Sequence, residues 1–215
     1  KCMDSPPLMT PAIPGLVWAY RFDAPTRSCY RLPLETTTRE LDVSDGFLWL
    51  HLNLADSRVP AFLESLPGLT PAALAALTTR DTHAAVILDE QRVYGTLIDF
   101  QKEFATETRD IGWLHFFVSE RIIVTTRLQP LRSVDRLKTA VEKNAARYHH
   151  PIDVFETLVA EFQRTMIGLV MELTDELNLI EDFVYDNAPR DERRKLAPVR
   201  RTVVRLHRHL RTVLT

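Results

Sequence analysis

Cysteine and long apolar runs are scarce in this sequence. Cys2 and Cys29 are the only cysteines among 215 residues, and they form no CxxC pair. This scarcity excludes a disulfide framework and a cysteine-rich zinc site, and it fits a reducing compartment. The longest uncharged run, residues 5–20, is interrupted by four prolines. A membrane-spanning helix needs about 20 mostly apolar residues. We therefore expect neither a spanning helix nor a signal peptide within these residues.

Motifs of catalysis are also missing. The sequence contains no phosphate-binding loop and no GxGxxG, HExxH or GxSxG motif, which predicts that the chain is not an enzyme and has no catalytic or cofactor-binding residue. His149 and His150 are adjacent, and His207 and His209 are two residues apart. Members of either pair diverge on a helix, so no metal-binding residue is predicted among them.

One histidine lies in a strand-like run. His51 should share a strand face with Trp49 and Asn53. This trio is interpreted as a polar edge of the core in preference to a metal site.

The first 130 residues are rich in β-branched and aromatic runs. Hydrophobic residues make up 45% and charged residues 26% of the chain, enough for a sizeable core. Short helices are expected over 60–66 and over 71–79, the latter with Thr70 as N-cap and Pro71 at its first position. This mixture of strand-like runs and short helices predicts an α/β or α+β layered domain. Strands are expected over 17–22, 47–52, 85–88, 93–100, 114–118 and 122–126, with hairpins at 89–92 and 119–121.

After residue 130 the pattern becomes helical. One helix is expected from about residue 133, with Val134, Leu137, Val141 and Tyr148 on one face. A second should run over 151–187. Its apolar stripe is Leu158, Phe162, Thr165, Leu169, Leu173, Leu177, Ile180 and Val184.

The last segment has a heptad pattern. Its members are Leu196, Val199, Val203, Leu206, Leu210 and Val213. Pro198 conflicts with an uninterrupted helix. Either the helix kinks there, or a turn precedes Pro198 and the regular helix begins at it. The pattern is unfinished at Thr215, and we expect the helix to continue beyond it.

Charge separates the last two helical segments. Residues 165–189 contain six acids and no Lys or Arg, whereas residues 190–211 contain nine Lys or Arg and two acids. The short connection predicts antiparallel neighbours. The acids then neutralise the bases, or the charges of several copies form a ring around an ion path or contact anions such as chloride. Nucleic-acid binding is disfavoured by a pI near 6.4 and the lack of a binding motif. The charge-ring or anion-contact candidates are Arg193, Arg194, Arg200, Arg201, Arg205 and Arg208, and the acidic partners are Asp175, Glu176, Glu181, Asp182 and Asp186.

Three ordered segments carry a family resemblance. They are residues 47–56 with the sequence FLWLHLNLAD, residues 120–127 with ERIIVTTR followed by Pro130 and Leu131, and residues 173–183 with LTDELNLIEDF. Together they resemble the cytosolic domain of the CorA-type metal-ion transporter family, in its zinc-transporting ZntB branch.

The resemblance implies a fold, a partner and a location. It implies a mixed sheet in α/β/α layers over 1–130, long antiparallel helices packing on a stalk over 131–189, and the start of the stalk helix over 190–215. The domain should be funnel-shaped, homopentameric and on the cytoplasmic side of the bacterial inner membrane. Two membrane helices with a Gly-Met-Asn signature should follow.

The resemblance also bears on the transported ion. Magnesium-transporting members often have acidic residues where this chain has Ala75 and Ala76, within residues 69–76. Alanine cannot bind Mg²⁺, which requires oxygen ligands, so zinc is predicted as the transported cation. The alternatives are a magnesium or cobalt transporter of the same family, or a soluble oligomeric scaffold or regulatory protein.

Overall fold

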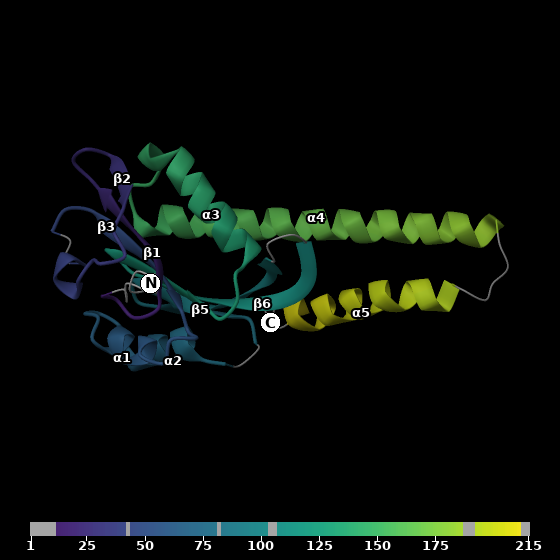
Figure 1. The fold of residues 1–215 in the computed structure, drawn as a ribbon, viewed down its shortest axis with the longest axis horizontal. Coiled ribbons are helices and arrows are strands. Elements are labelled where there is room, and N and C mark those ends of the chain that lie inside the picture. The colour runs from purple at the N-terminus through teal and green to yellow at the C-terminus, as the bar shows by residue number, and fades with distance from the viewer. Residues whose placement is uncertain (1–11, 42–43, 81–82, 103–106, 187–191, 212–215) are drawn as a thin grey trace, which may run out of the picture.

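A mixed β-sheet forms the centre of the N-terminal part, and two long helices extend beyond it (Figure 1). The computed structural model describes residues 12–41, 44–80, 83–102, 107–186 and 192–211. The strands are β1 (Leu16–Asp23), β2 (Ser28–Arg31), β3 (Phe47–Asn53), β4 (Ala85–Asp89), β5 (Arg92–Lys102), β6 (Glu107–Val118) and β7 (Ile122–Arg127). The helices are η1 (Thr38–Leu41), α1 (Val59–Glu64), α2 (Pro71–Thr78), α3 (Arg132–Lys143), η2 (Ala145–Arg147), α4 (Pro151–Asp186) and α5 (Glu192–Arg211).

The seven strands form one sheet in the order β2-β1-β3-β7-β6-β5-β4. The central pair β3 and β7 is parallel, with Leu50 opposite Val124, and the remaining pairs are antiparallel. Both predicted hairpins are confirmed, because β4 turns into β5 and β6 turns into β7.

Helices cover both faces of the sheet. Alternation along β3 sends Trp49 to one face and Leu50 to the other, where each is fully buried. Trp49 belongs to a cluster with Leu137 of α3 and Leu158 of α4. Leu50 belongs to a second cluster with residues of α1 and α2. The predicted α/β fold is confirmed, and its arrangement is an α/β/α layer structure (Figure 1).

A third core lies where the long helices meet one end of the sheet. Ile98 and Phe100 of β5 cluster there with Leu173 of α4 and with Val199 and Leu206 of α5. Beyond this core, α4 projects past the sheet and α5 returns antiparallel beside it (Figure 1).

Most of the predicted elements are present. The six predicted strands correspond to β1 and β3–β7, and the predicted short helices correspond to α1 and α2. Thr70 caps α2 as predicted, since its side chain accepts a hydrogen bond from the backbone N–H of Ala73. The long helix predicted over 151–187 is α4, which ends at Asp186.

Three details differ from the prediction. The edge strand β2 was missed, because its residues are mostly exposed and show no apolar alternation. Tyr148 does not belong to the first helix; α3 ends at Lys143, and Tyr148 follows η2 but is still buried. Pro198 does not begin the last helix, because α5 already starts at Glu192 and includes Pro198.

Candidate functional site: the helical layer and its polar contacts

The contact between α4 and α5 is apolar. Leu169, Leu173 and Ile180 of α4 are buried in one cluster with Val199 and Leu206 of α5. These α4 positions belong to the stripe predicted from the sequence. The two helices lie side by side, as the charge pattern predicted (Figure 1).

Only part of the predicted heptad pattern faces this contact. Val199 and Leu206 are buried, whereas Leu196 and Val203 are 37% and 46% exposed. The side chain of Leu210 and all of Val213 lie outside the described residues. The seam therefore does not pack as one continuous stripe over the part that is described.

The acids of α4 have a partner that sequence reasoning missed. Arg109 of β6 places Nη1 2.6 Å from Glu176 Oε2 and Nε 3.9 Å from Glu172 Oε2. These pairs attach the acidic helix to the sheet, about 65 residues earlier in the chain. Arg109 is one arginine in a strand, and no local pattern marks it as the partner of a distant helix.

The other predicted acids take different positions. Asp175 and Glu181 are exposed on α4, and the side chains of Asp182 and Asp186 lie outside the described residues. Pairing of these acids with arginines of α5 stays a prediction.

The predicted arginines line the outer side of α5. Arg200, Arg201, Arg205 and Arg208 are exposed, whereas the side chains of Arg193 and Arg194 lie outside the described residues. We define the α5 groove as the shallow depression lined by Leu196, Ala197, Arg200, Arg201, Val204, Arg205 and Arg208. Its floor is apolar and its rims are cationic, so it suits a partner that offers carboxylates or another anion around an apolar centre.

A buried carboxylate joins the sheet to the helices. Asp99 of β5 accepts hydrogen bonds from the backbone N–H and the hydroxyl of Ser133, both at 2.8 Å, and from the backbone N–H of Phe100 at 2.7 Å. Burial raises the pKa of Asp99 to about 6, although these hydrogen bonds act in the opposite direction. Ser133 Oγ also lies 3.2 Å from Thr165 Oγ1 of α4. Asp99 thus caps α3 from the sheet, next to α4.

The histidine of the predicted trio lies in a second buried cluster. His51 Nδ1 is 2.8 Å and Trp49 Nε1 2.9 Å from Thr125 Oγ1, which confirms that the two side chains share a face. Arg127 Nε donates to His51 Nε2 at 3.0 Å, so the proton of the neutral ring is on Nδ1. Burial, together with Arg127, lowers the pKa of His51 well below its ordinary value. With both ring nitrogens bonded, His51 is a core residue in this structure.

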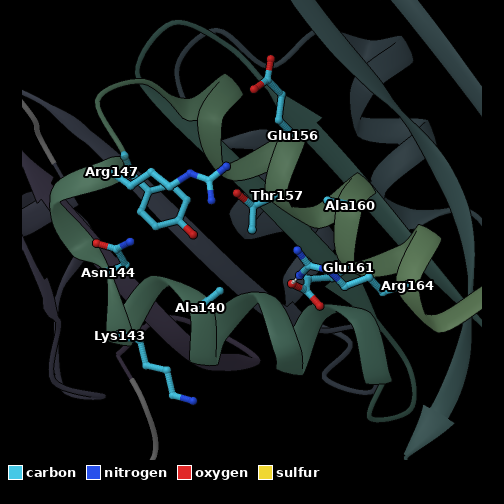
Figure 2. Close-up of a pocket in the computed structure, with 10 residues that line it drawn as sticks. Ala140, Lys143, Asn144, Arg147, Glu156, Thr157, Ala160, Glu161 and Arg164 are labelled. Carbon is cyan, nitrogen blue, oxygen red and sulfur yellow. Dashed lines mark hydrogen bonds and ion pairs between the residues drawn. The ribbon is translucent and has the colours of Figure 1, made fainter. Parts of the chain in front are cut away.

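A cavity of about 430 Å³, lined by several polar and charged residues, lies between α3, the turn after it and α4 (Figure 2). Arg147 reaches into it toward Thr157, whereas Lys143 and Glu156 point away. On its far wall, the largely buried Glu161 forms an ion pair with Arg164. The lining has both signs of charge, and Glu161 is neutralised within the wall. The cavity can hold water or a small polar molecule.

The described residues show neither a membrane span nor a metal cluster. Within the ranges given above, no helix combines the length and apolar character needed to cross a bilayer. Over the same ranges, His, Cys, Asp and Glu side chains do not gather in groups of three that could hold a metal ion.

Comparison with known families identifies the class of this chain. A family model described as CorA-like Mg2+ transporter protein matches residues 44–214, which include most of the sheet and the long helices. The chain therefore belongs to the family of CorA-like Mg²⁺ transporter proteins. A comparison with curated proteins returned no match.

Solved structures share the fold. Full-length CmaX matches with a TM-score of 0.79 and 22% identity, over 92% of this chain and 61% of CmaX. The ZntB cytoplasmic domain from Vibrio parahaemolyticus matches with a TM-score of 0.72 and 10% identity, over 93% of this chain and 76% of that domain. The soluble domain of CorA from Methanocaldococcus jannaschii matches with a TM-score of 0.67 and 16% identity, over 90% of this chain and 75% of that domain.

These similarities concern the fold of part of a larger protein. The chain spans 61% of the length of CmaX and 60% of the complete CorA magnesium transporter from Methanocaldococcus jannaschii. Its mixed sheet with long C-terminal helices is the fold of the soluble domains of this family. Identities of 10–22% do not assign the chain to the ZntB branch.

Proposed function

We propose that this chain is the cytoplasmic part of a divalent metal-ion transporter in the bacterial inner membrane. The observation that carries the proposal is the family match across residues 44–214, which includes α4 and α5 as well as most of the sheet. In the complete protein, membrane helices follow α5, and the helical layer described here is the stalk that leads to them. The complete protein is a homopentamer.

Zinc is the proposed transported ion. Ala75 and Ala76 lie on α2, where magnesium-transporting relatives are expected to place acids. Neither alanine side chain can bind a metal. The proposed transporter therefore has no magnesium-sensing site at these two positions. Magnesium and cobalt are the other ions to be compared.

The charges of the helical layer have a proposed role in assembly and not in holding the metal. The α5 groove presents guanidinium groups, which bind carboxylates and small anions such as chloride and repel free cations. Carboxylates of α4 screen this positive surface in the pentamer.

Reconstitution of the complete gene product tests the proposal. Proteoliposomes that contain an ion-sensitive dye are exposed to zinc, magnesium or cobalt in parallel, and empty liposomes are the control. We expect zinc influx. Influx of magnesium without zinc would overturn the proposed ion and leave the transporter in place. If a correctly folded pentamer carries none of the three ions, the proposed transport function is overturned.

A soluble scaffold is the second candidate, favoured by the apolar surface that α4 and α5 leave exposed. Membrane fractionation of cells that express the complete gene distinguishes the two. A product recovered entirely in the soluble fraction as an oligomer supports the scaffold, whereas an integral membrane product supports the transporter.

A further inference from the structure

The cavity between α3, the turn after it and α4 has the size of a ligand site (Figure 2). Its volume of about 430 Å³ falls within the range of about 300–1,000 Å³ that is typical of small-molecule pockets. Ala140 of α3 and Ala160 of α4 line it, and these small side chains keep open a space that larger residues would fill. The proposed transport function gives this cavity no role.

One wall of the cavity offers hydrogen-bond donors. Arg147, at the end of η2, reaches into the cavity (Figure 2), and within the described residues its guanidinium pairs with no carboxylate. Tyr148 follows it, lines the cavity and is 5% exposed. Its ring packs edge-on against Phe22, and over the same ranges its hydroxyl has no hydrogen-bond partner. Buried polar groups normally have a partner, so this hydroxyl indicates that a ligand group belongs beside it.

The wall formed by α4 offers acceptors. Thr157 and Glu161 are four residues apart and share one face of the helix. The hydroxyl of Thr157 donates its proton to the carbonyl of Asp153 at 2.9 Å, so only its lone pairs remain for a ligand. Arg164 pairs with Oε1 of Glu161, and among the residues described Oε2 has no partner. The Glu161 side chain is only 8% exposed, so a cation that approached from the cavity would offset part of the cost of burying its charge.

The two walls together select the charge of the ligand. A simple anion would pair with Arg147, but the carboxylate of Glu161 would repel it. A simple cation would pair with Glu161, but Arg147 would repel it. A metal ion is disfavoured further, because the described residues bring no three metal-binding side chains together. A molecule that has a carboxylate at one end and an ammonium group at the other gives each wall a charge-assisted hydrogen bond.

We propose that this cavity binds a small zwitterion, such as an amino acid. Its carboxylate lies against the guanidinium of Arg147 and the hydroxyl of Tyr148. Its ammonium group lies against Oε2 of Glu161 and the hydroxyl of Thr157. Because the ligand contacts both the turn after α3 and the face of α4, its binding holds these two elements together.

Isothermal titration calorimetry on the complete gene product tests the proposal with five small probes. Glycine, 4-aminobutyrate and 6-aminohexanoate carry both charges at increasing separation, whereas butyrate has only the carboxylate and butylamine only the ammonium group. At least one of the three zwitterions should bind, with one molecule per chain. Butyrate and butylamine should bind at least about tenfold more weakly than this zwitterion, because each lacks one of the two charge-assisted contacts.

Single substitutions assign each charge to its wall. Arg147→Ala should weaken binding of the zwitterion at least about tenfold without weakening that of butylamine. Glu161→Gln should weaken the zwitterion without weakening butyrate, and Tyr148→Phe should weaken both the zwitterion and butyrate. The matched controls are Lys143→Ala and Glu156→Gln, whose side chains point away from the cavity (Figure 2) and whose loss should leave the affinity of the zwitterion unchanged.

A filled cavity gives an independent control. Ala160→Leu places a larger side chain in the space and should abolish binding, and leucine keeps a high helix propensity. In the wild type, saturation with the zwitterion should slow hydrogen exchange in residues 144–161, which include both walls. The Ala160→Leu variant should show no such slowing. Circular dichroism checks that each variant is folded, and Arg147 is an exposed residue, so Arg147→Ala carries the test even if Glu161→Gln does not fold.

Three outcomes would overturn the inference. They are no binding of any of the three zwitterions, binding of butyrate or butylamine as tight as that of the best zwitterion, and binding that survives both Arg147→Ala and Ala160→Leu. None of them affects the proposed function, because these experiments measure no ion flux. Conversely, a complete protein that binds the zwitterion but carries no ion would overturn the proposed function and leave the site in place.

Discussion

Replacing Asp99 with asparagine should change how the stability of the protein depends on pH. Asp99 is 1% exposed, and its carboxylate accepts three hydrogen bonds between β5 and the start of α3. The variant keeps the shape of the side chain but cannot be ionised. Its amide group meets the donors of Ser133 less well than a carboxylate does, and that cost is similar at every pH.

The size of the pH effect follows from the shift in the pKa of Asp99. Burial raises the pKa of Asp99 from 3.8 in the unfolded chain to about 6 in the folded protein. Folded protein therefore binds the proton more tightly, and the stability that this provides is complete below pH 4 and is lost as the pH rises through 6. A pKa shift of about two units corresponds to about 3 kcal/mol of unfolding free energy. Relative to the wild type, the asparagine variant should gain about this much unfolding free energy between pH 4 and pH 7.

Urea unfolding at pH 4, 5, 6 and 7, followed by circular dichroism, measures the difference at each pH. Groups other than Asp99 titrate in both proteins and cancel. Ser133→Ala is the companion variant. In the wild type, the hydroxyl of Ser133 stabilises the charged carboxylate of Asp99 more than the neutral acid. Loss of this hydroxyl in Ser133→Ala should therefore reduce the free energy of unfolding more at pH 7 than at pH 4. A wild-type advantage that grows with pH would refute the reasoning, because it would mean that the hydrogen bonds outweigh burial.

Three further predictions concern packing, capping and pairing. Leu206→Ala should destabilise the protein by about 2–4 kcal/mol in urea unfolding, whereas Val203→Ala, at an exposed position of the same helix, should cost less than about 1 kcal/mol. Thr70→Ala should cost about 1 kcal/mol by thermal denaturation, because it removes the cap of α2. Arg109→Ala should cost at most about 1 kcal/mol, but it should increase hydrogen exchange in α4 around Glu176; an unchanged exchange rate would contradict the pairing.

Sequence patterns predicted the elements that bury one continuous face. The spacing in α4 identified Leu158, Leu169, Leu173 and Ile180, which are all buried. β3 was identified by its run of apolar and aromatic residues, and both of its faces are buried. Such elements are predictable because burial along their whole length imposes a pattern on the sequence.

Contacts between distant elements were not predictable in the same way. Arg109 pairs with Glu176 across 67 positions, and Asp99 caps α3 from 34 positions earlier. Each is a single polar residue in a strand with no periodic signal. Strand β2 was missed for a related reason, because an exposed edge strand of four residues needs no apolar alternation.

The α5 helix shows why a heptad pattern does not identify its partner. Apolar residues at heptad spacing predict a seam, and Val199 and Leu206 do bury against α4. Leu196 and Val203 continue the same pattern but stay more exposed, so the contact with α4 covers only part of the heptad seam.

The exposed apolar residues of α4 and α5 fit the assembly proposed for the complete protein. A surface helix of a monomer needs one apolar face, and the remaining face is polar. Here α4 has its buried stripe and, in addition, Ile167, Val170 and Met171 on the outside. On α5, Val204 is exposed between arginines in the same way. Covering these residues in the proposed assembly would remove their apolar surface from water, and the arginines beside Val204 would favour a partner surface that offers carboxylates.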